Sequence, residues 1–287
     1  MSSEAIMLDG AAGSLALHQL SGGDDSAHTL LIGHANGFPA RAYRAFARAL
    51  GDDIRVFALD FRAHGESAAP DDLSGFAWAG MTEDLQTATE YLATLGIDKP
   101  HGFGHSLGGA AMIDLERKHP GTFASVFTFE PVMAPKGAIE ADSKLTRSAE
   151  GRLRTFPSKE AALMRYSARP PLSLFRPDVL FDYVQHGFMY MPDGSVTLAC
   201  KPEHEAEIYR QGADTIHLDQ AAEVDSEIVV GRSGDGGFAA QVAGLIVELA
   251  PNGRLLDFPD LTHFGPLQDP VGVAAATHEL IESNSTV

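Results

Sequence analysis

The stretch Gly104-His105-Ser106-Leu107-Gly108 places a serine between two glycines, after a short apolar run and at the start of a helix-like run that ends before Pro120. Such a serine can occupy a tight strand-to-helix turn that exposes its hydroxyl. Glycine suits the flanking positions because a Cβ would clash in so crowded a turn. The following helix points unpaired N–H groups and the positive end of its dipole at the same place. The stretch therefore predicts a nucleophilic serine beside a site for an oxyanion.

Short apolar segments alternate with helical patterns on both sides of this stretch. We expect strands at 5–8, 14–20, 29–32, 54–59, 125–129, 227–230 and 254–258. We expect helices at 40–50, 81–95 with Thr82 as its N-cap, 238–249 and 270–281. Between residues 132 and 221 the alternation gives way to helical spacing with several prolines. This order predicts the α/β class, with a core of residues 1–131 and 222–287 and a helical segment of residues 132–221 inserted into it.

Composition excludes several classes of function. The chain has 287 residues, a net charge of −18 and a hydrophobic fraction of 44%. So acidic a balance disfavours nucleic-acid binding, which requires clustered Lys and Arg. No apolar run approaches the roughly 18 residues that a membrane span needs, and the N-terminus does not resemble a signal peptide. Cys200 is the only cysteine, so we expect a buried thiol, no disulfide and a cytoplasmic location.

Four further motifs follow the ends of expected strands, and they are listed here in chain order: His34 to Pro39, Asp60 to Ser67, Phe129-Glu130-Pro131 and Thr262 to Leu267. Open α/β sheets build their binding and catalytic sites at the carboxyl ends of their strands. Side chains from these motifs are therefore expected to meet near Ser106.

Together these motifs make the chain resemble the α/β-hydrolase superfamily, in the branch that carries a helical cap after strand six. The resemblance implies a mostly parallel eight-stranded sheet flanked by helices, a Ser-acid-His triad and a pocket between core and cap. The pattern is most similar to haloalkane dehalogenases and epoxide hydrolases, but those enzymes use an Asp nucleophile. Because Ser106 stands at that position here, we expect acyl transfer instead.

The catalytic assignment has one open alternative. Ser106 needs a base within hydrogen-bond reach, and His263 matches the family position after the last strand. Two residues compete for the role of the acid. Asp235 lies near the common position after strand seven, whereas Glu130 ends strand six in a Phe-Glu-Pro context that resembles part of the capped branch. We favour Glu130, since a carboxylate buried at a strand end needs a partner such as the triad histidine.

The oxyanion hole requires two N–H donors. We expect the first to be the backbone N–H of Leu107 and the second to come from Asn36 or, failing that, Ala35. His34 is expected to anchor this loop, and Asp60 and Arg62 to support it from below. The substrate pocket is expected to contain apolar side chains of the core and the cap, namely Phe38, Phe181, Phe188, Met189 and Phe264.

We therefore expect a serine hydrolase that cleaves esters of small or medium apolar acyl groups through an acyl-enzyme. A lactonase, thioesterase, amidase or C–C hydrolase would use the same triad. A ligand-binding protein without catalytic activity is the alternative from another class. We expect no cofactor and no metal, a small ester-like molecule as the partner, and a homodimer as a possible assembly.

Overall fold

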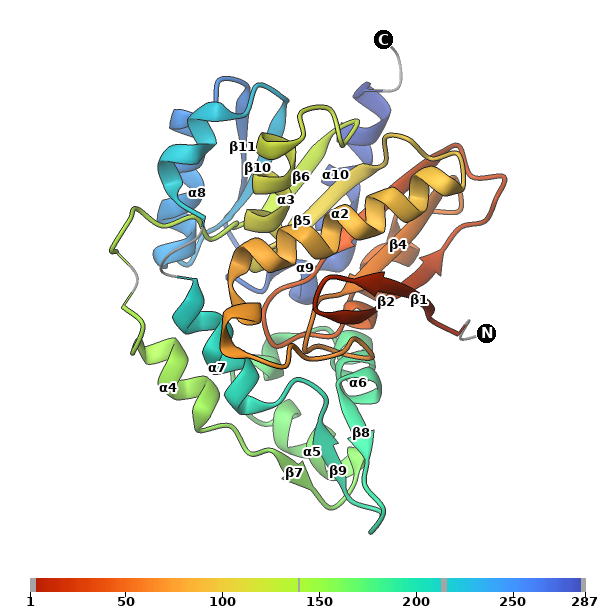
Figure 1. Cartoon of the computed structure of the whole chain (residues 1–287), viewed down its shortest axis with the longest axis vertical. Helices are drawn as coiled ribbons and strands as arrows, with labels where there is room; N and C mark the ends of the chain where they lie inside the picture. The colour runs from red at the N-terminus through yellow and green to blue at the C-terminus, as the bar shows by residue number, and fades with distance from the viewer. Residues whose placement is uncertain (1–3, 139, 213–215, 285–287) are drawn as a thin grey trace.

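The centre of this computed structural model, which describes residues 4–138, 140–212 and 216–284, is an eight-stranded sheet (Figure 1). Its strands are β1 (Ile6–Gly10), β2 (Gly13–Ser21), β3 (His28–Gly33), β4 (Ile54–Asp60), β5 (His101–His105), β6 (Val126–Phe129), β10 (Ile228–Ser233) and β11 (Gly253–Phe258). Their order across the sheet is β1-β2-β4-β3-β5-β6-β10-β11. The β1–β2 and β2–β4 pairs are antiparallel, and the remaining pairs are parallel. The predicted mostly parallel sheet is therefore confirmed.

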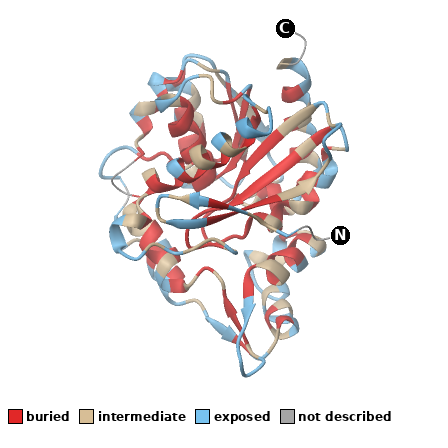
Figure 2. Ribbon diagram, turned by 45° about the vertical axis from the view of Figure 1, so that its right-hand side comes forward, coloured by how far each residue is buried: buried red, intermediate tan, exposed pale blue. Residues whose placement is uncertain are grey.

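Both faces of the sheet are covered by apolar side chains. In β3, Leu31 belongs to one hydrophobic cluster, whereas Leu30 and Ile32 belong to a second cluster on the opposite face. All three side chains have 0% exposed surface. Successive residues of a strand point to opposite faces, so a continuous apolar run requires helices on both sides. Figure 2 shows these strands as a buried layer between helices.

The helices divide between the two faces. One cluster contains apolar residues of α2 (Trp78–Thr94), α3 (Leu107–Lys118) and α8 (Phe238–Leu249). The other contains residues of η1 (Ala40–Tyr43), α1 (Arg44–Ala49), α9 (Gly265–Gln268) and α10 (Pro270–Asn284). A short helix, η2 (Leu73–Phe76), precedes α2. Across the described ranges, we find no helix with the length and apolar character that a membrane crossing requires.

The start of α2 differs from the prediction. The helix begins at Trp78 with Ala77 as its N-cap, so Thr82 lies inside the first turns rather than at the cap. The Thr82 hydroxyl instead donates to Asp114 of α3 at 2.8 Å. The capping pattern was misread because a buried threonine between two packed helices satisfies its hydroxyl through the neighbouring helix.

The segment expected as an insertion, residues 132–221, lies between β6 and β10, and these two strands pair directly with each other. It forms the lower part of the molecule in Figure 1. Its elements are α4 (Lys144–Glu150), β7 (Thr155–Phe156), α5 (Lys159–Ser167), η3 (Leu172–Leu174), α6 (Pro177–His186), β8 (Phe188–Tyr190), β9 (Val196–Leu198) and α7 (Pro202–Gln211). A further short helix, η4 (Leu218–Glu223), crosses its C-terminal boundary.

The description of this segment as helical was incomplete. A three-stranded antiparallel sheet in the order β7-β9-β8 accompanies its helices. The turn between β8 and β9 contains Asp193 and Gly194, and Gly194 has φ 85°. An Asp-Gly turn between short aromatic and β-branched runs is a hairpin signal that sequence reasoning missed.

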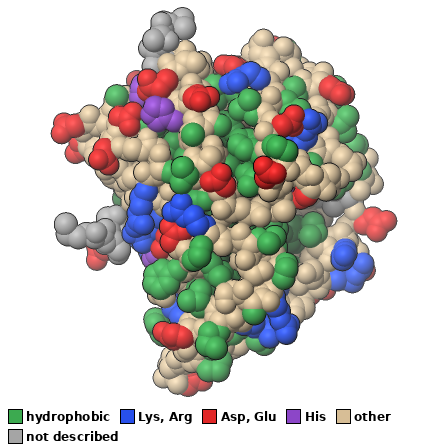
Figure 3. All heavy atoms as spheres, turned by 180° about the vertical axis from the view of Figure 1, so that it is seen from behind, with side chains coloured by type: hydrophobic (Ala, Val, Ile, Leu, Met, Phe, Trp, Pro, Cys, Tyr) green, Lys and Arg blue, Asp and Glu red, His purple; other side chains and the backbone are tan. Residues whose placement is uncertain are grey.

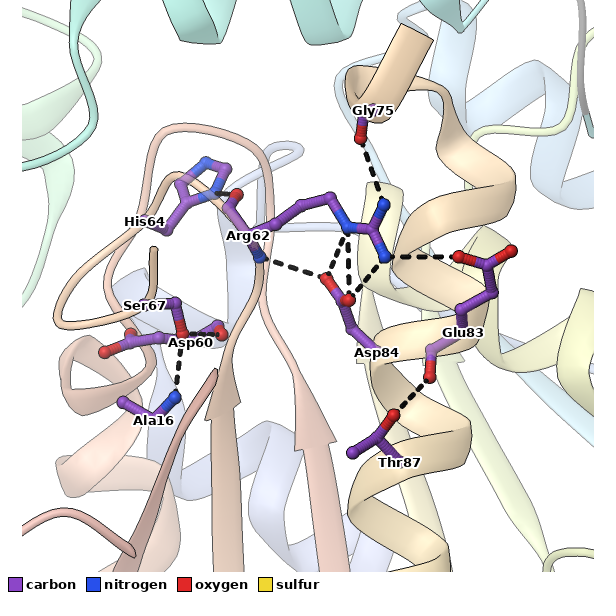
Figure 4. A network of polar contacts seen from close by, with 9 residues as sticks. All are labelled: Ala16, Asp60, Arg62, His64, Ser67, Gly75, Glu83, Asp84 and Thr87. Atoms are coloured by element: carbon purple, nitrogen blue, oxygen red, sulfur yellow. Dashed lines mark hydrogen bonds and ion pairs between the residues drawn. The ribbon is translucent and has the colours of Figure 1, made fainter. Parts of the chain in front are cut away.

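A buried ion pair supports the loop after β4 (Figure 4). The guanidinium of Arg62 donates to both carboxylate oxygens of Asp84 on α2, with Nη2 2.7 Å from Oδ1. Its Nη1 also donates to the carbonyl of Gly75 at 3.1 Å. A bidentate contact of this kind fixes both partners in orientation. The expected structural role of Arg62 beneath the site agrees with this geometry.

Candidate active site

Ser106 lies on a strained turn between β5 and α3. Its backbone has φ 54° and ψ −114°, a conformation that residues other than glycine rarely adopt. The flanking glycines are required by close backbone contacts. A Cβ on Gly104 would lie 2.5 Å from the Cα of Gly109, and one on Gly108 would lie 2.1 Å from the carbonyl oxygen of Gly33. The local sequence therefore places the serine hydroxyl at the end of the sheet, at the start of a helix.

His263 follows β11, on a loop that brings it to the same cavity as Ser106. Its Nδ1 lies 2.7 Å from Oε2 of Glu130. Since an ionised carboxylate can only accept, Nδ1 carries the hydrogen and Nε2 has a free lone pair. An imidazole in this tautomer can accept a proton from a hydroxyl.

Glu130 is completely buried, with a side-chain exposure of 0%. Its second oxygen, Oε1, accepts from the backbone N–H of Ser233 at 2.8 Å. Both carboxylate oxygens therefore have a donor, which offsets the cost of burying the charge. The residue has φ 43°, so the end of β6 bends sharply where the side chain turns toward His263.

Asp235 contacts the backbone of His263 rather than its ring. Its Oδ2 accepts from the His263 N–H at 3.1 Å, and its Oδ1 accepts from the Gly237 N–H at 2.8 Å. Partial burial raises the pKa of the Asp235 carboxyl. The hydrogen bonds from the N–H groups of Gly237 and His263 lower it by more, so the pKa lies below its ordinary range. Of the two acids, Glu130 is the one that touches the imidazole, and Asp235 supports the loop that carries it.

The three expected oxyanion donors differ in whether their N–H groups already have an acceptor. Leu107 is the first residue of α3, so its N–H has no partner within the helix. The N–H of Ala35 donates to the Tyr43 hydroxyl at 3.2 Å, and the side-chain amide of Asn36 donates to the Glu205 carbonyl at 3.1 Å. The Ala35 N–H is therefore occupied, and one of the two N–H donors of the Asn36 side chain is used by the Glu205 carbonyl.

No acceptor for the backbone N–H of Asn36 occurs within the described ranges, so Asn36 stays the expected second donor. The expectation for Ala35 is corrected, because its backbone N–H already donates to the Tyr43 hydroxyl. The local sequence does not reveal that Tyr43 lies beside this N–H. His34 holds this loop as expected, with Nδ1 donating to the Ala35 carbonyl and Nε2 accepting from the Phe61 N–H. Burial lowers the pKa of His34 to about 4.

A buried chain of hydrogen bonds joins the Ala35 loop to the His263 loop. His105 Nε2 lies 2.8 Å from the carbonyl oxygen of His263, so this nitrogen must be the donor. His105 Nδ1 then accepts from the Tyr43 hydroxyl at 2.6 Å, and that hydroxyl accepts from the Ala35 N–H. Burial lowers the pKa of His105 well below its ordinary value and keeps the ring neutral. Sequence reasoning assigned His105 a structural role but missed Tyr43.

Ser106 and His263 line a cavity of about 550 Å³ between the core and the inserted segment. Phe38 and Phe264, both predicted pocket residues, lie in its wall. Additional apolar lining comes from residues that sequence reasoning did not select: Trp78, Val132, Leu145 and Phe238.

Three other predicted pocket residues lie elsewhere. Phe181 and Met189 are exposed, with 49% and 46% of their surface accessible, and Phe188 packs against Phe156 with ring centroids 5.5 Å apart. None of the three lines the cavity as the described residues define it. Helix α6 buries Val179, Leu180, Tyr183 and Val184, which leaves Phe181 on its outer face.

Comparisons with known proteins agree with this architecture. The model of a family described as the alpha/beta hydrolase family matches residues 30–276. No match was found among curated proteins.

Among solved structures, E-2-(acetamidomethylene)succinate hydrolase is similar with a TM-score of 0.79 and 18% identity, covering 97% of this chain and 98% of that one. A thermophilic esterase from Thermogutta terrifontis has a TM-score of 0.73 and 18% identity, covering 99% and 100% of the two chains. The thioesterase domain from the curacin biosynthetic pathway has a TM-score of 0.75 and 16% identity, covering 98% and 99%. At these identities the likeness concerns the fold.

Proposed function

Because this chain belongs to the α/β-hydrolase family, we propose that it is a serine hydrolase that cleaves a carboxylic ester through an acyl-enzyme intermediate. The observation that carries the proposal is the 2.7 Å contact between Glu130 and His263, in a cavity that Ser106 also lines. Two of the similar structures are named as an esterase and a thioesterase, which is consistent with acyl transfer.

In the first half of the reaction, His263 Nε2 removes the proton of the Ser106 hydroxyl while Oγ attacks the ester carbonyl carbon. The carbonyl oxygen becomes an oxyanion that accepts from the N–H groups of Leu107 and Asn36. The tetrahedral intermediate collapses when His263 returns the proton to the departing alkoxide. The alcohol leaves, and the acyl group stays bound to Ser106.

In the second half, His263 takes a proton from a water molecule that attacks the acyl carbon. A second oxyanion forms in the same place. When it collapses, the bond between the acyl carbon and Ser106 Oγ breaks and His263 returns the proton to Oγ, which releases the carboxylic acid and restores the Ser106 hydroxyl. Glu130 holds the imidazole in the productive tautomer and stabilises the imidazolium that forms in each half. Its two donors, His263 and the Ser233 N–H, keep this charge in place in a buried site.

The carbonyl oxygen of His263 is held by His105, and the His263 N–H is held by Asp235. The loop is therefore fixed on both sides of its peptide backbone. We infer that these two contacts position the imidazole, while Glu130 accepts the hydrogen bond from its ring. The inserted segment then serves as a cap that closes the cavity over the reacting carbonyl.

A fluorophosphonate probe tests the proposal, since it labels a serine only when the hydroxyl is activated. We expect labelling of the wild type and none of Ser106→Ala or His263→Ala. A panel of 4-nitrophenyl esters, thioesters, lactones and amides then ranks the bond types, with esters expected to turn over fastest. Absence of labelling in a folded wild type would favour a ligand-binding protein without this activity.

A further inference from the structure

A second cavity of about 360 Å³ adjoins the one that contains Ser106. The two cavities share part of their walls, listed here as Asn36, Phe38, Leu145, Tyr209 and Phe264. The remaining lining of the second cavity comes from the inserted segment, chiefly from α4, α5 and the loop that follows α5. A substrate with its ester at Ser106 can therefore extend a second group into this space.

The second cavity is basic although the protein as a whole is acidic. Three arginines line it, Arg152, Arg165 and Arg169, with Glu205 as the single acidic residue among its lining. The inserted segment has eleven bases against twelve acids, a net charge of −1, so −17 of the total of −18 belongs to the rest of the chain. On the face shown in Figure 3, several basic side chains lie in the lower part, where the inserted segment is found.

One of the three arginines is neutralised by contacts within the protein. Arg152 forms an ion pair with Glu205, and its Nη2 donates to the Tyr183 hydroxyl at 2.5 Å. Its side chain has only 19% exposure. Arg152 therefore supports the wall of the cavity, with its charge balanced by Glu205.

Arg165 and Arg169 differ from Arg152 in this respect. Both line the cavity and are solvent-accessible, and within the described ranges no carboxylate pairs with either guanidinium. Arg165 lies in the last turn of α5, and Arg169 directly follows Ala168, the C-cap of that helix. Both residues line the same cavity. Guanidinium groups of this kind bind planar carboxylates through paired N–H donors.

The charges of the first cavity have the opposite sign. Glu130, Glu140 and Asp235 line it against a single cation, Lys144. An anionic group is therefore repelled from the Ser106 end and attracted to the arginine end. Between the two ends lies an aromatic wall, in which the ring of Phe38 is 6.0 Å from that of Phe264 and 5.2 Å from that of Tyr183. This arrangement suits an apolar spacer.

We propose that Arg165 and Arg169 bind a carboxylate of the substrate, and that the natural substrate is an ester whose acyl group ends in a second, free carboxylate. This inference rests on the proposed serine-hydrolase function and specifies the class of its substrate. The ester carbonyl lies at Ser106, the spacer crosses Phe38 and Phe264, and the free carboxylate reaches the two arginines.

The test compares mono-4-nitrophenyl adipate with methyl 4-nitrophenyl adipate, in which the distal carboxylate is replaced by its uncharged methyl ester. We expect the wild-type kcat/KM to be roughly tenfold higher for the substrate with the free carboxylate, which is the effect of one partly exposed charge-assisted contact. This preference should disappear at high salt. The double variant Arg165→Gln, Arg169→Gln should lose the preference through KM, with the methyl ester affected less than about twofold. The matched control is Arg154→Gln, which removes a surface pair with Glu203 and lines neither cavity.

Equal kcat/KM for the two esters in the wild type, or an unchanged preference in the double variant, would overturn the inference while leaving the hydrolase proposal intact. Failure of the proposed function appears differently, as loss of fluorophosphonate labelling and of turnover of both esters. Competitive inhibition distinguishes the ligand type. Adipate should inhibit in a manner that depends on both arginines, and stronger inhibition by inorganic phosphate than by adipate would show that the site selects phosphate and contradict the proposal.

Discussion

The carboxylate of Glu130 lies 2.7 Å from Nδ1 of His263, although the two residues are 133 positions apart in the chain. The glutamate directly follows β6, and the histidine follows β11, the last strand of the chain. Their contact orients the imidazole toward the cavity that Ser106 lines. The second acid of the site, Asp235, reaches the same loop but contacts only its backbone.

Replacing the two acids by their amides separates these roles. Glu130→Gln should reduce kcat/KM by roughly ten-thousandfold, the size seen when a triad acid is removed, because the imidazole loses its orienting charge. Asp235→Asn keeps an acceptor for the His263 N–H and should lower kcat/KM by less than about tenfold. Hydrolysis of 4-nitrophenyl butyrate measures both variants. If Asp235→Asn were the more damaging change, Asp235 and not Glu130 would be the triad acid.

Tyr43→Phe tests the buried chain that joins the two catalytic loops. The substitution leaves the Ala35 N–H and His105 Nδ1 without their partner, which should cost about 1–3 kcal/mol of stability for each unpaired group. We expect kcat to fall with little change in KM, because the loops lose alignment while the apolar pocket stays intact. Chemical denaturation and steady-state kinetics measure the two effects.

Tyr190→Phe is the matched control for that experiment, since Tyr190 is 72% exposed and its hydroxyl takes no part in the hydrogen bonds that join the two loops. It should leave both stability and kcat unchanged. A Tyr43→Phe variant with wild-type kcat would show that His105 holds its position without the tyrosine.

Gly108→Ala tests the packing of the turn that carries Ser106. Its added Cβ would lie 2.1 Å from the carbonyl oxygen of Gly33. This oxygen belongs to the backbone of β3, so it cannot move away unless the strand shifts. We expect loss of fluorophosphonate labelling and a lower melting temperature. Gly23→Ala is the control, because no atom lies within 4 Å of the added Cβ. Full labelling of Gly108→Ala would show that the turn tolerates a side chain.

Acid should destabilise the protein through His34. Burial lowers the pKa of this residue from 6.5 to about 4, while the charge of Asp60 raises it and that of His18 lowers it. The unfolded chain therefore binds a proton between these two pH values when the folded protein does not. Stability from this group is complete above pH 6.5 and declines as the pH falls toward 4.

The expected loss from His34 alone is of order 2 kcal/mol at pH 5, relative to pH 7. Urea denaturation across this range measures the free energy of unfolding, and NMR titration of the imidazole C–H signals identifies the group. Titration of His34 near pH 6.5 in the folded protein would contradict the prediction.

The sequence by itself determined the sheet and the place of the nucleophile. The apolar run 29–32 predicts a strand buried on both faces, and the glycines around Ser106 fit a tight turn between a strand and a helix. These features depend on neighbouring residues, so they can be recognised along the chain. The candidates Ser106, His263 and Glu130 followed from their positions after strands.

Only the tertiary structure decided which groups meet in space. Glu130 and Asp235 both follow strands next to the His263 loop, and a sharp backbone bend at Glu130 selects the acid that contacts the ring. The Ala35 N–H is occupied because η1 brings Tyr43 beneath it, and Phe181 faces outward because α6 packs through its other side. Such outcomes depend on side-chain direction and on packing between distant segments, which periodicity along the chain does not specify.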